Sequence, residues 1–360
     1  MIIKKLQLNN FRNYEGLSVT FSEGVNLLYG DNAQGKTNIL EAVFLAATTK
    51  SIRGSKDREM IRFGEEEAHV CAFAERQGIP HKIDIHLKKN KKKGLAVDGI
   101  PIRRSAELLG LLHAISFSPD DLSMMKNGPE ERRRFIDLEL CQTDKIYCSN
   151  LADYNRTLTQ RNDLLKQIVG NPSLRGTLEV WDSQLVRFGT YLIRARKKLI
   201  EELLPIAAAK HATLTGDKEA LTIVYEPNCS GEDFAESLRR NTERDIASKF
   251  TTTGPHRDDM ALFINGVNVR MYGSQGQQRT AALSLKLAEI ELAKKTIHDT
   301  PILLLDDVLS ELDRNRQLQL LNEMQDVQTI VTCTGMEEFV ACRPEGNTIY
   351  RVSGNQIYSV

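Results

Sequence analysis

The stretch Gly30-Asp31-Asn32-Ala33-Gln34-Gly35-Lys36-Thr37 decides how the rest of the sequence is interpreted. It follows an apolar run, 25–29, that predicts a strand, and it precedes an alanine-rich run, 38–48, that predicts a buried helix. Glycines at this spacing let backbone N–H groups face a phosphate, and the helix N-terminus adds positive potential. The pattern therefore predicts a P-loop that binds ATP through residues 30–37, with Lys36 reaching the β- and γ-phosphates and Thr37 ligating Mg²⁺.

A second pair of candidate residues ends an apolar strand near the other end of the chain. Residues 302–305 are all apolar, and Asp306 and Asp307 follow them directly. A buried strand that ends in a carboxylate is typical of a Walker B motif, in which Asp306 holds Mg²⁺ through water. Asp307 is placed to orient the attacking water as a catalytic base, with Lys36 as the second catalytic residue. A strand followed by an ordinary polar turn is the alternative, and the P-loop argues against it.

A second glycine-containing turn lies one helix upstream of that strand. It is Tyr272-Gly273-Ser274-Gln275-Gly276-Gln277-Gln278-Arg279, leading into a predicted helix at 279–295. Ser274 can cap this helix, and Gly276 lets the backbone approach a ligand. Taken alone, the segment is better explained as an ordinary capped helix start. Its position before the Walker B strand favours a second anion-binding element.

The order of these motifs resembles that of the ABC ATPases. Ser274, Gly276 and Gln277 resemble the ABC signature motif, and the segment 310–313, Ser-Glu-Leu-Asp, resembles the D-loop. In that family two ATPase heads enclose two ATP molecules. The resemblance implies that Ser274, Gly276 and Gln277 contact ATP in trans, on the P-loop of a second copy.

Four further segments narrow the resemblance to the RecF family, over nearly the whole chain. They are Asn10-Phe11-Arg12-Asn13-Tyr14, Phe117-Ser118-Pro119-Asp120-Asp121-Leu122, Thr253-Gly254-Pro255-His256-Arg257-Asp258-Asp259, and the full segment 272–279. RecF proteins are related to the heads of SMC and Rad50 and lack their long coiled coil, in keeping with the absence of a long heptad insertion here. The resemblance also implies that Arg12 and Asn13 belong to the ATP site.

The expected fold is α/β: an ABC-type P-loop ATPase lobe, with a mixed sheet around the P-loop helix, and an inserted, mainly helical second lobe. We expect the ATPase lobe at 1–117 and 296–360 and the second lobe, which ends in the signature and its helix, at 118–295. Apolar residues at helical spacing predict two long helices in the second lobe, separated by a turn at 171–176. Asn265-Gly266 predicts a hairpin between strands at 260–264 and 267–271.

Composition limits how this chain can attract nucleic acid. Lys+Arg and Asp+Glu both total 48, so the formal net charge is zero and a positive field over the whole protein is excluded. Contacts to DNA must come from local basic patches. The candidates are Lys50, Arg53 and Lys56 after the P-loop helix, and Lys89, Lys91, Lys92 and Lys93 at the tip of a predicted hairpin. A solvated tip explains the second group equally well, and Arg132–Arg134 are better explained by ion pairs between lobes.

The remaining composition favours an intracellular protein. The six cysteines form no Cys-x-x-Cys pair and no zinc spacing. The start of the chain alternates as a strand and lacks the apolar core of a signal peptide, and no apolar stretch of about 18 residues exists to span a membrane. We therefore expect a reducing, cytoplasmic compartment.

Two landmarks of the ABC ATPases are missing. The switch histidine of transporters would follow the predicted strand 329–333, where Thr334 and Gly335 stand. Ser118 occupies the plausible position of the Q-loop glutamine. Both departures suggest slow hydrolysis.

The resemblance implies a protein of recombinational repair and replication. ATP would drive dimerisation and closure on duplex or gapped DNA, including single/double-strand junctions, and slow, DNA-stimulated hydrolysis would release it. RecR, with RecO, would then join it to load RecA at gaps. One alternative is the ATPase subunit of a membrane ABC transporter; another is a clamp that binds ATP without hydrolysing it.

Overall fold

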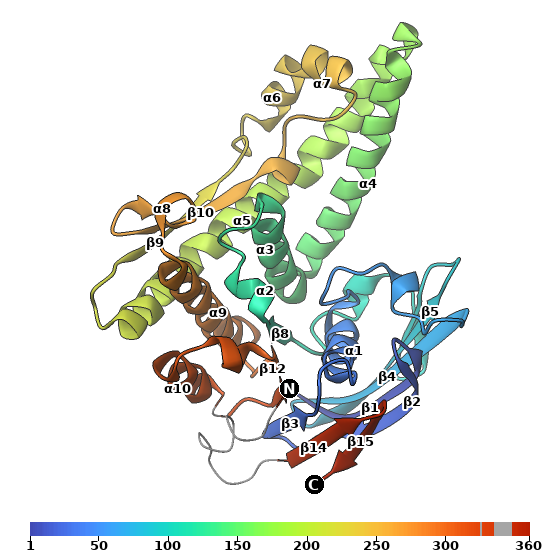
Figure 1. Cartoon of the computed structure of the whole chain (residues 1–360). Coiled ribbons are helices and arrows are strands. Elements are labelled where there is room, and N and C mark those ends of the chain that lie inside the picture. Colours follow the sequence, from blue (N-terminus) through green and yellow to red (C-terminus); the bar gives the residue numbers. More distant parts are fainter. Residues whose placement is uncertain (325, 335–347) are drawn as a thin grey trace. The chain divides into compact units, whose positions relative to one another are not determined.

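The computed structural model describes residues 1–324, 326–334 and 348–360 (Figure 1). The chain forms two compact units, Met1–Leu122 with Leu285–Val360, and Ser123–Ser284. Helix α9 (Gln275–Ile297) crosses from the second unit into the first.

The first unit contains a six-stranded sheet with the order β15-β14-β3-β13-β12-β8. All neighbouring strands in it are parallel except the terminal β14–β15 hairpin. Its central strands are almost entirely buried and mostly apolar, as expected for a sheet covered on both faces. The strands are β3 (Val25–Tyr29), β8 (Ala114–Phe117), β12 (Ile302–Asp306), β13 (Thr329–Cys333), β14 (Thr348–Ser353) and β15 (Gln356–Ser359).

A second six-stranded sheet in this unit is antiparallel, with the order β2-β1-β4-β5-β6-β7. Its strands alternate between buried apolar and exposed polar residues, as expected for a sheet with one solvated face. The lysine-rich hairpin predicted from the sequence connects β5 and β6. The strands are β1 (Ile2–Phe11), β2 (Tyr14–Thr20), β4 (Glu67–Arg76), β5 (Ile79–Lys88), β6 (Gly94–Val97) and β7 (Ile100–Ile102).

Helix α1 (Lys36–Thr48) makes contacts with strands of both sheets. Eleven of its thirteen residues are buried, which explains its alanine-rich, apolar sequence without an exposed polar face. The other helical segments of the unit are short: η1 (Asp57–Glu59), η2 (Ser105–Glu107), α2 (Pro119–Leu122), η5 (Val308–Glu311) and α10 (Arg314–Glu323). The α/β fold predicted from the sequence, with a mixed sheet around the P-loop helix, is confirmed.

The second unit is mainly helical, as predicted. Its two longest helices, α4 (Lys145–Ile168) and α5 (Leu178–Thr215), pack together, and Leu164, Leu165, Ile168 and Leu178 form a buried cluster against which Trp181 lies. The shorter helical segments are α3 (Pro129–Thr143), η3 (Pro172–Thr177), α6 (Phe234–Arg240), α7 (Thr242–Ser248), η4 (Pro255–Arg257) and α8 (Val269–Tyr272).

A small antiparallel sheet with the order β11-β10-β9 also belongs to the second unit. Its strands are β9 (Leu221–Glu226), β10 (Asp259–Ile264) and β11 (Val267–Asn268). The predicted hairpin at Asn265-Gly266 is present, but the prediction of a strand over 267–271 is wrong beyond Asn268. The Asn268 side chain accepts from the N–H of Met271 and starts helix α8, so local capping ends the strand.

Candidate nucleotide site

The P-loop connects the C-terminal end of β3 to helix α1, in the context the sequence predicted. Gly35 has a φ of 100° at the N-cap, and an added Cβ would lie 2.6 Å from the Tyr14 hydroxyl, so only glycine fits. Lys36 is 4% exposed, and its Nζ donates to the carbonyls of Gly30 at 2.6 Å and Asp31 at 3.0 Å. The lysine ammonium therefore lies within the curl of the loop.

Both candidate magnesium-binding residues lie at the C-terminal edge of the parallel sheet. Thr37 Oγ1 donates to Asp306 Oδ1 at 2.8 Å. Strand β13 stands between β3 and β12, so the P-loop and the end of the Walker B strand meet at one edge. Two hard oxygen donors this close suit Mg²⁺, which also takes ligands from substrate phosphates.

Asp307 occupies an unusual backbone position beside Asp306. Its φ is 50°, in the left-handed region that aspartate tolerates better than most residues. Burial raises the pKa of its carboxyl, Lys36 opposes this shift, and Asp306 adds to it. Its backbone N–H donates to Thr332 Oγ1 at 3.0 Å. A carboxylate with a raised pKa next to the lysine of the P-loop is suited to accept a proton.

Arg12 and Asn13 form the turn between β1 and β2, and the structure gives each a set of protein contacts. Arg12 makes a bidentate ion pair with Glu41, through Nε at 2.7 Å and Nη2 at 2.8 Å. Glu41 is fully buried on α1 and also accepts from Ser51 Oγ. Asn13 Oδ1 accepts a hydrogen bond of 2.7 Å from Nδ2 of Asn38, the residue that follows Thr37 on α1. Both residues therefore brace the P-loop helix in this structure.

The turn of the C-terminal hairpin also contacts the P-loop, which the sequence did not suggest. Gly354 N–H donates to Gln34 Oε1 at 2.8 Å, and Asn13 Nδ2 donates to Asn355 Oδ1. A Cβ on Gly30 would lie 2.2 Å from the Val352 carbonyl oxygen. The only signal in the sequence is the Gly354-Asn355 turn itself, which indicates a hairpin but not its neighbour.

The positions of the two missing ABC landmarks are partly visible. Thr334 follows β13 and is exposed, while Gly335 lies outside the described residues. Ser118 follows β8, the strand beside β12, and its N–H and hydroxyl donate to Asp121 Oδ2 at 2.8 and 3.0 Å. The Asp121 carboxylate, in the first turn of helix α2, thus accepts both hydrogen bonds from Ser118.

The signature segment lies in the second unit and starts helix α9. Ser274 Oγ accepts from the Gln277 N–H at 3.2 Å, and Gln277 Oε1 accepts from the Ser274 N–H at 3.0 Å. This reciprocal pair is a capping box, so the prediction that Ser274 caps the helix is confirmed. Gln277 Nε2 also donates to Glu219 at 2.9 Å. Ser274 and Gly276 are exposed.

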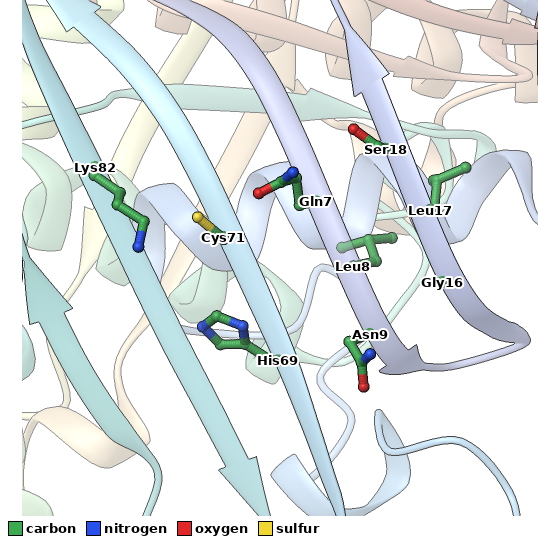
Figure 2. A pocket seen from close by; sticks show the side chains of 9 residues that line it. All are labelled: Gln7, Leu8, Asn9, Gly16, Leu17, Ser18, His69, Cys71 and Lys82. Carbon is green, nitrogen blue, oxygen red and sulfur yellow. The ribbon is translucent and has the colours of Figure 1, made fainter.

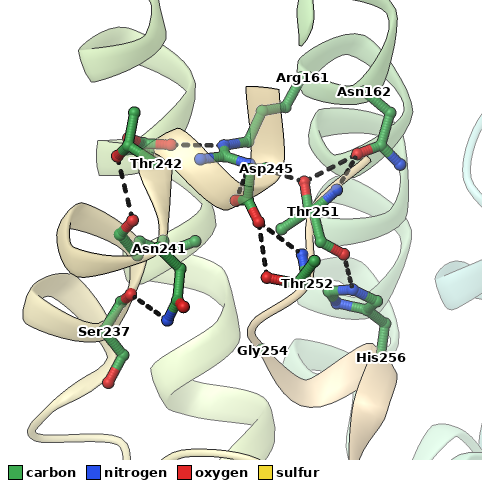
Figure 3. Close-up of polar contacts among 12 residues, drawn as sticks. Arg161, Asn162, Ser237, Asn241, Thr242, Asp245, Thr251, Thr252, Gly254 and His256 are labelled. Atoms are coloured by element: carbon green, nitrogen blue, oxygen red, sulfur yellow. Dashed lines mark hydrogen bonds and ion pairs between the residues drawn. The ribbon is translucent and has the colours of Figure 1, made fainter. Parts of the chain in front are cut away.

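The segment Thr251–Asp259 packs between helices of the second unit (Figure 3). His256 Nε2 donates to the Thr251 carbonyl at 3.0 Å, so its Nδ1 accepts from the Tyr154 hydroxyl at 2.8 Å. Burial lowers the pKa of His256 to about 4, in agreement with this neutral form. Thr251 Oγ1 accepts from the buried Arg161, which also pairs with Asp245 at 2.7 Å.

Asp258 and Asp259 extend this polar interior, and their partners could not be predicted from the order of residues. Asp258 pairs with the buried Arg196 at 2.9 Å and accepts from the Tyr225 hydroxyl. Burial raises the pKa of Asp258, and Arg196 opposes the shift. Asp259 makes a bidentate pair with Arg132 at 2.7 and 2.9 Å. The segment is thus a structural junction, and Arg132 pairs within its own unit.

The basic residues proposed to contact DNA all belong to the first unit. Lys93 Nζ donates to the Thr49 carbonyl at 2.6 Å and to Asp57 at 2.9 Å, which ties the lysine-rich hairpin to the segment after α1. Lys89 pairs with Glu66 at 2.9 Å. The remaining candidates are exposed: Lys50, Arg53, Lys56, Lys91 and Lys92.

A shallow hollow of about 510 Å³ lies on the outer face of the antiparallel sheet, away from the P-loop residues (Figure 2). Gly16 and Ser18 leave space there, while Lys82 and His69 both pair with Asp84, at 3.0 and 3.1 Å. Among the described residues no group of three or more His, Cys, Asp or Glu side chains could hold a metal ion. No helix in the described part of the chain is long and apolar enough to cross a membrane.

Comparison with known proteins decides the family. The profile described as RecF/RecN/SMC N terminal domain matches residues 2–356. The protein named "DNA replication and repair protein RecF" from Lachnoclostridium phytofermentans is 60% identical over 352 residues, which cover 98% of each chain. The chain belongs to the RecF family. The RecF of Agathobacter rectalis is 55% identical over 99% of both chains.

Solved structures give the same result. A RecF structure described as "recombination mediator protein RecF-ATP in RecFOR pathway" matches with a TM-score of 0.91 and 35% identity, covering 99% of this chain and 97% of that one. The Smc head of Pyrococcus furiosus matches with a TM-score of 0.57 at 16% identity, which shows a shared fold. The predicted RecF resemblance is confirmed, and nothing in these comparisons supports the transporter alternative.

Proposed function

We propose that this RecF-family chain binds ATP with Mg²⁺ as a switch for dimerisation on DNA, in recombinational repair and replication. The observation that carries the proposal is the 2.8 Å contact between Thr37 and Asp306, which joins the P-loop to the Walker B strand. The similarity to a RecF structure with ATP supports the choice of nucleotide.

Within the site each residue has a defined task. Residues 30–37 bind the phosphates, Lys36 carries the positive charge toward the β- and γ-phosphates, and Thr37 and Asp306 hold Mg²⁺, which neutralises phosphate charge. Asp307 orients the attacking water and accepts its proton. Arg12 and Asn13 lie beside the loop. Asn13 accepts a hydrogen bond from Asn38, in the first turn of α1, which is the end of the helix that faces the phosphates.

The signature of a second copy would complete the site. Ser274 and Gly276 are exposed at the start of α9, so they are accessible to the nucleotide of a partner. Ser274 and Gly276 contact the partner's nucleotide only when the dimer is closed. ATP therefore favours the closed dimer, and hydrolysis removes that preference. The absence of a switch histidine in the sequence is in keeping with slow, DNA-stimulated turnover.

DNA binding is assigned to the basic surface formed by Lys50, Arg53, Lys56, Lys91 and Lys92. Lys89 and Lys93 already have acidic partners, so their contribution requires those ion pairs to loosen. Duplex DNA or single/double-strand junctions are the ligands, and RecR, with RecO, is the partner that leads to loading of RecA. The clamp without hydrolysis is disfavoured because Asp307 lies beside Lys36 and the metal-binding Asp306.

The experiment is light scattering of the full chain with ATP, ADP or no nucleotide, together with duplex DNA binding at several salt concentrations. We expect a dimer and tight DNA binding with ATP only. Replacing Lys91 and Lys92 by glutamate should flatten the salt dependence of DNA binding, whereas Lys197→Glu with Lys198→Glu, in the second unit, should not. A monomer in ATP, or equal DNA binding in ADP, would refute the switch.

A further inference from the structure

A buried threonine on strand β13 contacts both aspartates of the site. Thr332 lies opposite Asp306 in the register of β12 and β13, and it is 1% exposed. Its Oγ1 donates to Asp306 Oδ1 at 2.8 Å and accepts from the N–H of Asp307 at 3.0 Å. A single hydroxyl thus donates a hydrogen bond to the carboxylate of Asp306 and accepts one from the backbone of the next residue.

We propose that Thr332 is a positioning residue for Mg²⁺-dependent nucleotide binding; this inference rests on the function proposed above. Asp306 Oδ1 accepts from two hydroxyls, those of Thr37 and Thr332. Thr37 can ligate a metal with a lone pair while its hydrogen still points to Asp306. Thr332 does not belong to the P-loop, so it restrains the carboxylate independently of the residues that bind the phosphates.

The same hydroxyl supports the left-handed backbone of Asp307. A residue with φ near 50° is held there by its surroundings, and the hydrogen bond from its N–H to Thr332 is one such restraint. Thr332 therefore sets the orientation of Asp306 and the direction in which Asp307 leaves the strand. Loss of the hydroxyl should weaken both without touching the residues that bind the phosphates.

The alternative is that Thr332 merely satisfies buried polar groups. The two roles differ in what they do to metal dependence. Loss of a purely structural hydroxyl changes stability and leaves the Mg²⁺ requirement of nucleotide binding unchanged. Loss of a positioning hydroxyl raises the Mg²⁺ concentration needed for nucleotide binding, while nucleotide binding in EDTA stays the same.

The test is binding of a fluorescent, non-hydrolysable ATP analogue to the full chain across a Mg²⁺ series and in EDTA. Thr332→Val removes only the hydroxyl, and we expect its Mg²⁺ midpoint to rise about tenfold, the value of one hydrogen bond to a charged group. Thr332→Ser keeps the hydroxyl and should stay near wild type. Thr329→Val is the matched control, because that buried hydroxyl on the same strand donates to the Val327 carbonyl and, within the described residues, has no contact with Asp306 or Asp307.

Thr332→Ala provides a second hydroxyl-free variant if Thr332→Val fails to fold. A wild-type Mg²⁺ midpoint in either folded variant overturns the proposal, and so does a shift in Thr332→Ser as large as that of the hydroxyl-free variant. If wild type itself binds the analogue with no dependence on Mg²⁺, the proposed function fails instead, so the two failures are distinguishable.

Discussion

Thr37 and Asp306 lie 269 positions apart in the chain, and their side chains meet in a hydrogen bond of 2.8 Å. The contact exists because both residues stand at the C-terminal edge of one parallel sheet, with β13 between their strands. It brings together the hydroxyl and the carboxylate of the proposed Mg²⁺ site, both of them oxygen ligands of the kind that Mg²⁺ prefers.

Lys36→Met should abolish ATP binding. The buried ammonium lies in the curl of the P-loop, and methionine keeps its length without its charge. We expect affinity for a fluorescent ATP analogue to fall by about 100-fold or more, since hydrogen bonds from a cation to two phosphates are lost. Lys4→Met, at a surface pair with Glu23, is the control. Unchanged affinity in Lys36→Met would refute the P-loop assignment.

Asp307→Asn should bind ATP and hydrolyse it about 10²- to 10⁴-fold more slowly, because a general base is removed without a change of shape. The ATP-bound dimer should persist on DNA. In wild type, burial raises the pKa of Asp307, so turnover should fall with acidification at a higher pH than for an ordinary aspartate. Single-turnover hydrolysis measures both effects. Normal turnover in the variant would exclude Asp307 from catalysis.

Ser274→Arg should spare nucleotide binding by the monomer and prevent the ATP-dependent dimer. Ser274 is exposed at the start of α9, where a long cation would occupy the space needed by a partner's nucleotide. Light scattering with ATP measures the dimer, and Ser173→Arg, on the exposed turn before α5, is the matched control. A dimer formed by Ser274→Arg would reject the contribution in trans.

Tyr14→Phe should leave the free energy of unfolding unchanged or raise it by up to about 1 kcal/mol. The Tyr14 hydroxyl is buried beside Gly35, and it has no hydrogen-bond partner among the described residues. Tyr147→Phe should instead cost about 1–3 kcal/mol, since that hydroxyl accepts from Arg196 and donates to Asp137. Urea denaturation of both variants measures the difference. Equal destabilisation would show that Tyr14 has a partner.

Acidification should destabilise the chain through His256. Its pKa is about 4 in the folded state, below the ordinary 6.5, so the unfolded chain takes up the proton first as the pH falls. The free energy of unfolding should therefore decrease by about 2 kcal/mol between pH 7 and pH 5 from this residue alone. His256→Gln does not titrate and should lack that part of the decrease. Parallel pH curves for the two proteins would contradict the assignment.

Local patterns in the sequence were enough to predict the strand–loop–helix context of the P-loop and the buried strand ending in Asp306-Asp307. The capping role of Ser274 was also predictable, because it depends on residues three positions apart. The strand over 267–271 was predicted wrongly, since a cap at Asn268 competed with the alternating pattern. Such effects act between residues a few positions apart, so they can be recognised in the sequence.

The order of residues was enough to predict the family, the motifs and the residue types of the proposed site, because phosphate and magnesium binding need glycines, a lysine, a hydroxyl and a carboxylate at fixed spacing. Which distant residues contact them depends on the fold. The hydroxyl of Thr332 donates a hydrogen bond to Asp306, and the turn of the C-terminal hairpin donates one to Gln34. Arg196 donates one to Asp258. These contacts depend on strand order and register, which bring residues together irrespective of their separation along the chain.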